Sequence, residues 1–234
     1  MPEGGLKVDV SDGIAVLTLD RPSVRNALSH SLRTKLQSTL GELDSHENVR
    51  AIVLTGADPA FCAGVDMKEF NDPGCTSDLT GEGGPFFRCT TPVIGAINGP
   101  AYTGGLELAL ACHFRVASER AVFADTHARL GFTPGRGLTV LLTDAVGSAR
   151  ARQLALTGEP IDAATALAWG LVNEVVPHER LHERATLLAQ RIAANDPHAV
   201  RRLHHTFESQ AAARQASSWV IEAAGFMGPQ PRQT

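Results

Sequence analysis

Two short glycine-containing segments combine small residues with a charged side chain. In residues 61–68 (Phe-Cys-Ala-Gly-Val-Asp-Met-Lys), the small side chains of Ala63 and Gly64 would let a ligand approach backbone N–H groups. Residues 104–107 (Gly-Gly-Leu-Glu) open an apolar stretch, and an N–H at a helix start, such as that of Gly104, points outward unpaired and is reinforced by the helix dipole. Both segments could therefore bind an oxyanion or a phosphate. Taken alone, the first segment is more simply a tight turn, and Glu107 in the second is more simply an acidic residue that stabilises a first helical turn.

Both segments follow apolar runs that predict buried strands. Residues 51–54 and 93–97 are short apolar runs that end in turn-forming residues, and residues 14–19 form a similar run stopped by Arg21 and Pro22. Leucines at positions 32, 36, 40 and 43 recur at helical spacing, which predicts a helix between the first two strands. These segments alternate in the order strand, helix, strand.

Later segments continue the alternation and then become helical. We expect further strands at 114–117, 121–124 and 171–176, and helices at 138–157, 162–169 and beyond 176 with a break at 195–197. Residues 71–85 are rich in Gly and Pro and predict a surface excursion. The pattern predicts an α/β fold, with a core over residues 1–195 and a helical C-terminal region over 196–234.

Composition and charge exclude several classes of protein. Of the 234 residues, 43% are hydrophobic and 20% are charged, as in ordinary globular domains. The net charge of −4 argues against nucleic acid as a partner. No apolar run reaches a membrane span of about 18 residues, and residues 1–10 lack the charged and apolar regions of a signal peptide. We expect a cytoplasmic protein with no membrane partner.

Together, the two glycine-containing segments resemble the signature of the enoyl-CoA hydratase/isomerase (crotonase) family. Residues 26–28 (Asn-Ala-Leu) and the run from Leu156 to Val172 are also similar to family features, and the resemblance covers about residues 6–210. It implies a crotonase-like (ClpP/crotonase) core of ββα units and a lyase of fatty acid metabolism. It also implies a homotrimer or hexamer, and a C-terminal region shorter than that of many relatives.

The ligand implied by this resemblance is an acyl-CoA thioester, whose coenzyme A part makes any separate cofactor unnecessary. The thioester oxygen would accept hydrogen bonds from the N–H groups of Ala63 and Gly104, the two halves of an oxyanion hole. Such a donor contributes about 3–4 kcal/mol to stabilising an enolate. The resemblance also implies substrate contacts from Arg25, Ala27, Ala63, Gly64, Val65, Asp66, Lys68 and Gly104.

Glu107 and His127 are the expected catalytic residues. Family hydratases commonly place two glutamates about the alkene. Glu107 matches the first, and His127 stands where the second is usual. A histidine there could exchange protons near neutrality, or it could simply line a polar pocket. Asp125, two residues earlier, would face the same side as His127 in a regular strand and could orient its imidazole.

Three alternatives to hydration stay open. The first is double-bond isomerisation, in which a proton is removed and returned, or another crotonase-type acyl-CoA reaction that uses Glu107 and His127. The second is a relative that binds acyl-CoA without turning it over. The third alternative comes from another class, because residues 178–182 (His-Glu-Arg-Leu-His) formally match the zinc-peptidase motif H-E-x-x-H. Pro177, Arg180 and Glu183 make that segment an exposed helix start, so we expect no metal.

Overall fold

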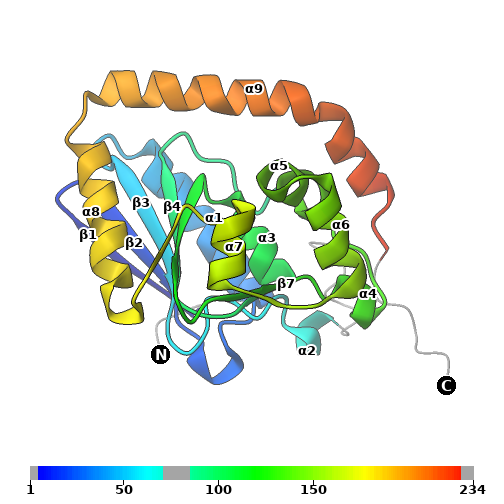
Figure 1. The fold of residues 1–234 in the computed structure, drawn as a ribbon. Coiled ribbons are helices and arrows are strands. Elements are labelled where there is room, and N and C mark those ends of the chain that lie inside the picture. Colours follow the sequence, from blue (N-terminus) through cyan, green and yellow to red (C-terminus); the bar gives the residue numbers. More distant parts are fainter. Residues whose placement is uncertain (1–4, 71–84, 228–234) are drawn as a thin grey trace.

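The computed structural model describes residues 5–70 and 85–227 of the chain. The predicted surface excursion at 71–85 lies outside these ranges apart from Pro85, and so does the end of the C-terminal region from residue 228. Within the described residues the fold is α/β, as predicted, with two sheets and a helical C-terminal part (Figure 1).

The larger sheet has six strands in the order β1-β2-β3-β4-β6-β9. Strand β1 (Leu6–Ser11) pairs antiparallel with β2 (Ile14–Leu19). From β2 onward every neighbour is parallel, through β3 (Ala51–Gly56), β4 (Val93–Ile97), β6 (Phe114–Ser118) and β9 (Glu174–Val176). All of β4 and nearly all of β3 are buried, which explains their uninterrupted apolar sequences.

Helices cover both faces of this sheet. On β3, Ile52 and Leu54 belong to one apolar cluster, with the buried leucines of α1 (His30–Ser45). Ala51 and Val53 belong to a second cluster with α8 (Leu181–Ala193), because successive strand side chains point to opposite faces. The parallel strands therefore lie between two helical layers (Figure 1).

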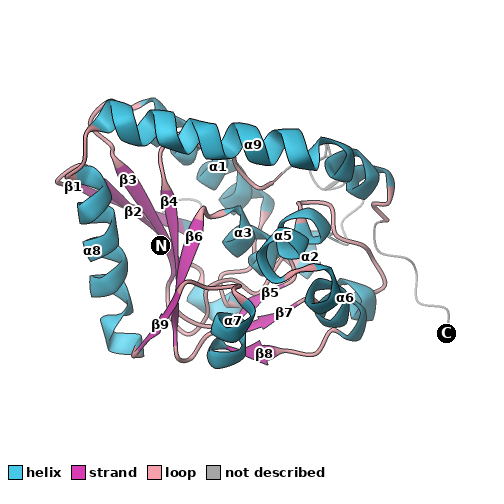
Figure 2. Cartoon of the chain, turned by 45° about the horizontal axis from the view of Figure 1, so that its top comes forward, coloured by secondary structure: helices cyan, strands magenta, loops and turns pink. Residues whose placement is uncertain are grey.

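The smaller sheet positions the starts of two helices. It contains β5 (Ala101–Tyr102), β7 (Val122–Ala124) and β8 (Ile161–Asp162), with β5 parallel to β7 (Figure 2). Helix α3 (Gly104–Ala111) begins just after β5, and α4 (His127–Leu130) begins just after β7. Parallel pairing of β5 and β7 therefore brings the N-termini of α3 and α4 to the same edge of the small sheet.

The remaining elements are mostly helical. They are η2 (Pro22–Val24), α2 (Met67–Phe70), the π-helix η4 (Leu138–Leu142), α5 (Thr143–Val146), α6 (Ser148–Thr157), α7 (Ala163–Trp169), η5 (His178–Arg180) and α9 (Pro197–Ala224). Helix α9 runs across the top of the molecule and bends downward toward its C-terminal end (Figure 1). No helix within the described ranges is long and apolar enough to cross a membrane.

Most predicted elements are present, with differences at glycines and short strands. The expected helix at 138–157 is divided at Gly147, whose φ of +81° interrupts the helical backbone. The expected strand at 171–176 is paired only from Glu174. Strands β1, β5 and β8 were not predicted. The last two contain only two residues each, which is too short for a periodic pattern.

Gly105 allows α3 to lie directly against the 61–65 segment. A Cβ atom at Gly105 would lie 2.1 Å from the carbonyl oxygen of Cys62, so even alanine would force the helix and the segment apart. We expect Gly105→Ala to lower the free energy of unfolding by about 1–3 kcal/mol in urea denaturation.

The same change at Gly41, in the interior of α1, is the matched control. A Cβ atom there has nothing within 4 Å, so Gly41→Ala should raise the free energy of unfolding by about 0.5–1 kcal/mol. Equal stability of Gly105→Ala and the parent protein would show that the helix does not depend on this contact.

Candidate active site

Two loops lie side by side at the site although they are far apart in the sequence: the first is residues 25–28 and the second is residues 63–66. Leu28 and Val65 form a parallel bridge, in which Leu28 N–H donates to Gly64 O and Asp66 N–H donates to Leu28 O. Asn26, fully buried, holds the first loop in place because its amide group donates to the carbonyls of Ala57 and Ala60. The structure thus brings together the residues around Ala27 and Ala63 that the sequence placed at one site.

The structure corrects the prediction that Ala63 supplies a free amide. Its N–H donates to the carbonyl of Arg25 at 3.0 Å, so this amide is already occupied by the neighbouring loop. The segment is not a regular strand, because Gly64 has a φ of +101° and interrupts the alternation of N–H directions that a strand would have. The N–H groups of Ala63 and Asp66 face the first loop, whereas the intervening N–H of Val65 has no backbone acceptor among the described residues. The available amide is that of Val65.

The amides of Val65 and Gly104 lie close to each other. A Cβ atom at Gly104 would lie 3.4 Å from the Val65 nitrogen, and a Cβ atom at Gly64 would lie 3.4 Å from the Gly104 nitrogen. The Gly104 N–H, in the first position of α3, likewise has no backbone acceptor in the described part of the chain. Two adjacent donors of this kind can bind one oxygen atom.

Glu107 is buried one helical turn beyond Gly104, with only 3% of its surface exposed. Its Oε1 accepts the backbone N–H of Arg136 at 2.9 Å, which fixes the carboxyl group. Burial raises its pKa to about 7, although His127 and the Arg136 amide act in the opposite direction. A carboxyl group with this pKa can give or take a proton near neutral pH.

His127 faces Glu107 from the start of α4, with 3.9 Å between His127 Nε2 and Glu107 Oε2. Its Nδ1 lies 2.6 Å from Asp125 Oδ1, which also accepts the His127 backbone N–H. Burial lowers the pKa of His127, but the Asp125 hydrogen bond and the nearby carboxylates outweigh burial and raise it overall. Because Asp125 accepts at Nδ1, the exchangeable nitrogen is Nε2, which faces Glu107.

The predicted contact between Asp125 and His127 is therefore present, but a regular strand does not produce it. Strand β7 ends at Ala124, and His127 already belongs to α4. The starts of the two helices are also joined by a 2.6 Å hydrogen bond between the hydroxyl groups of Thr103 and Thr126. This contact helps to keep Glu107 and His127 on facing helix ends.

The other predicted substrate contacts lie around these loops. Arg25 and Lys68 are exposed, so both cations are accessible to a ligand. Asp66 is partly buried, and its carboxylate pairs with Arg21 at 3.0 Å. The guanidinium of Arg21 also donates to Ala27 O, so this ion pair joins the two loops. Asp66 thus has a structural role that the sequence did not reveal.

The zinc-peptidase interpretation is wrong for the segment at 178–182. His178 lies in a 3₁₀ turn and Leu181 begins α8, so the two histidines are not one turn apart on a single α-helix. Both ring nitrogens of His178 are engaged, Nδ1 with Ser118 Oγ and Nε2 with Asp58 Oδ2, each at 3.0 Å. The geometry required for two metal ligands is absent from this segment.

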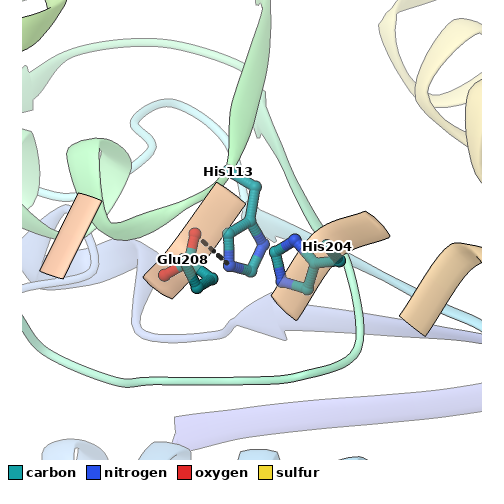
Figure 3. A group of neighbouring side chains, drawn as sticks. All are labelled: His113, His204 and Glu208. Carbon is teal, nitrogen blue, oxygen red and sulfur yellow. Dashed lines mark ion pairs between the residues drawn. The ribbon is translucent and has the colours of Figure 1, made fainter. Parts of the chain in front are cut away.

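A separate cluster contains His113, His204 and Glu208 (Figure 3). The Nδ1 atom of His113 accepts the Val93 N–H at 2.8 Å, so in the neutral ring Nε2 carries the proton, and Nε2 lies 4.0 Å from Glu208 Oε1. A histidine that binds a metal usually donates its other ring N–H to an acceptor, which is the reverse of this arrangement. The cluster therefore fits a polar contact between α9 and His113, the residue just before β6, better than a metal site.

Comparison with known proteins identifies the family. Residues 9–231 match the enoyl-CoA hydratase/isomerase family, and the chain belongs to it. A probable enoyl-CoA hydratase of Rhizobium meliloti is 40% identical over 81% of this chain and 75% of its own length. The peroxisomal probable enoyl-CoA hydratase 1 of Arabidopsis thaliana is 38% identical over 82% and 74%, respectively.

Solved structures agree with this family assignment. The crystal structure of an enoyl-CoA hydratase from Mycobacterium avium matches with a TM-score of 0.88 and 43% identity, and the match covers 94% of each chain. The predicted crotonase-like fold and the family resemblance are thus confirmed.

The role of Asp125 can be tested by titrating His127. Because the Asp125 hydrogen bond and charge raise the pKa of His127, Asp125→Asn should lower that pKa, as measured by NMR of the His127 ring protons. The control is Asp162→Asn, which changes an exposed carboxylate at the start of α7. It should leave the His127 titration unchanged, whereas an unchanged titration in Asp125→Asn would contradict the proposed orientation.

Proposed function

We propose that this protein is an enoyl-CoA hydratase, a lyase that adds water across the 2,3 double bond of an acyl-CoA thioester. The observation that carries the proposal is the buried Glu107–His127 pair beside the free amides of Val65 and Gly104. Relatives at 38–40% identity bear the same activity in their names. The geometry supplies both requirements of the reaction, stabilisation of an enolate and exchange of protons.

The amides act on the thioester. Val65 N–H and Gly104 N–H would donate to the carbonyl oxygen, which polarises the conjugated double bond and makes C3 electrophilic. Charge grows on this oxygen as water adds, so fixed donors bind the transition state more tightly than the substrate. The Gly104 donor is also favoured by its position at the start of α3.

The buried pair moves the protons. The Glu107 carboxylate would remove a proton from water as the water oxygen bonds to C3, and the double-bond electrons move toward the thioester oxygen as an enolate. His127, protonated at Nε2, then gives its proton to C2, which completes the 3-hydroxyacyl product. Glu107 is left protonated and His127 neutral, so one proton must return to Nε2 across the 3.9 Å that separates the two groups.

The surroundings of the pair favour this division of roles. The pKa of Glu107, about 7, leaves a substantial carboxylate fraction near neutrality. Asp125 raises the pKa of His127, so the imidazolium is better populated than for a free histidine. Activity should rise as pH increases through the pKa of Glu107 and fall as pH increases through that of His127.

Substrate binding and cellular context extend this proposal. Coenzyme A is anionic, and exposed Arg25 and Lys68 next to the joined loops could bind its phosphates. Because the coenzyme is part of the substrate, the reaction needs no separate cofactor. A cytoplasmic location and assembly as a homotrimer or hexamer stay predictions of the family resemblance.

Hydration of crotonyl-CoA, followed by the loss of enoyl-thioester absorbance, is the direct test. The parent protein should catalyse it, and Glu107→Gln and His127→Ala should each reduce kcat by about 10²–10⁴-fold, because each loses one proton-transfer group. Glu119→Gln and His182→Ala make the same chemical changes at exposed positions outside the site and should behave like the parent.

The same assay separates the alternatives. A parent that migrates the double bond of a 3-enoyl-CoA but does not hydrate crotonyl-CoA would be an isomerase, and one that binds crotonyl-CoA without either reaction would be a binding relative. Either result would contradict the hydratase proposal.

The pH dependence gives an independent prediction. In His127→Ala the alkaline limb of the kcat profile should disappear, because the group whose deprotonation causes it is gone. The acid limb should remain, since it reports Glu107. Retention of both limbs would assign the alkaline limb to another group.

A further inference from the structure

The segment from Thr133 to Thr139 lies between the active site and the end of α9. Facing the site, the Arg136 N–H donates to Glu107 Oε1. Facing α9, the Thr133 hydroxyl donates to Gly225 O at 2.8 Å, and Thr133 N–H donates to Met227 O at 3.0 Å. The amide that fixes the Glu107 carboxyl therefore belongs to a segment that is also hydrogen-bonded to the residues at the end of α9.

Glu222 makes the most extensive polar contact with this segment. Its carboxylate is 7% exposed, and it accepts Gly137 N–H at 2.5 Å and Thr139 N–H at 2.7 Å. It also accepts the Thr139 hydroxyl. One buried carboxylate thus binds three donors, from Gly137 and Thr139, which flank the start of the π-helix at Leu138, and Gly137 directly follows Arg136.

Aromatic side chains of the same helix end fit against glycines of the segment. A Cβ atom at Gly137 would lie 2.4 Å from the Trp219 ring, and one at Gly135 would lie 2.7 Å from the Phe226 ring. Gly137 also has a φ of +100°, which other residues rarely adopt. Residues 133, 135, 137 and 139 therefore all approach the end of α9, while the N–H of Arg136 is directed at Glu107.

Glu222 also acts on the site through its charge. Its carboxylate raises the pKa of both Glu107 and His127, and Asp125 does the same. The guanidinium of Arg136, on the held segment itself, lies 5.9 Å from the centroid of the Phe86 ring. The negative charge of Glu222 therefore favours the protonated forms of both Glu107 and His127.

We propose that Glu222 is a positioning residue for the Glu107–His127 pair, holding residues 137–139 so that the Arg136 amide fixes the Glu107 carboxyl. Glu222 acts through this segment and does not touch the substrate. The inference rests on the proposed function, because it treats Glu107 as the base whose orientation matters.

Two variants separate the hydrogen bonds from the charge. Glu222→Ala removes both and should lower kcat for crotonyl-CoA by about 10- to 100-fold with little change in KM, because a misplaced base slows the reaction more than binding. Glu222→Gln keeps one acceptor oxygen and removes the charge. Both limbs of its kcat profile, and the His127 titration followed by NMR, should move to lower pH.

His204→Ala is the matched control on the same helix. Buried His204 joins α9 to the Cys89 carbonyl at 3.1 Å and belongs to the cluster in Figure 3, 18 residues before Glu222 on the same helix. We expect this variant to lose stability but to keep the pH limbs and the His127 titration of the parent. A merely structural role for Glu222 would produce the same behaviour in the Glu222 variants.

The titration needs no substrate, so it also distinguishes this inference from the hydratase proposal. A parent protein without hydratase activity would overturn the proposed reaction. In that case the His127 titration in Glu222→Gln would still show whether the Glu222 charge raises the pKa of His127. An active parent whose kcat, pH limbs and His127 titration are unchanged in both Glu222 variants would overturn the positioning role.

Discussion

The close contact between Gly105, in the first turn of α3, and Cys62 is the constraint on which the rest of the site depends. Gly105 lies so close to Cys62 O that no side chain fits between them, and this closeness leaves the Val65 and Gly104 amides side by side. Burial of Glu107 follows from the same contact, since its helix is packed into the molecule from its first turn. The proximity of the two amides and the raised pKa of Glu107 thus have a common structural origin.

Electrostatics around the pair depend on segments from three parts of the chain. Asp125 follows β7, Glu107 lies in α3 and Glu222 lies near the end of α9. Each carboxylate favours protonation of His127, while the Arg136 amide favours the ionised form of Glu107. The histidine at position 127 is therefore compatible with proton transfer, because the neighbouring carboxylates favour its protonated form.

Sequence patterns predicted the elements whose periodicity is strong. The buried strands at 14–19, 51–56 and 93–97 contain apolar runs, and the helix at 30–45 has regular leucine spacing. Strands β5 and β8 were missed because two residues carry no period, yet β5 decides where α3 begins. The donor assigned to Ala63 was wrong because a sequence does not show which way each amide of an extended segment faces.

By itself, the sequence determined the fold class and the family, and it offered Glu107 and His127 as catalytic candidates, because these depend on residue types and local motifs. Only the tertiary structure decided that Val65 rather than Ala63 has an available amide, that Arg136 fixes Glu107 through its backbone, and that Glu222 holds this segment from α9. Each of these contacts joins segments distant in the sequence, and all three involve main-chain N–H groups, which every residue except proline possesses. Local sequence carries no mark of such contacts.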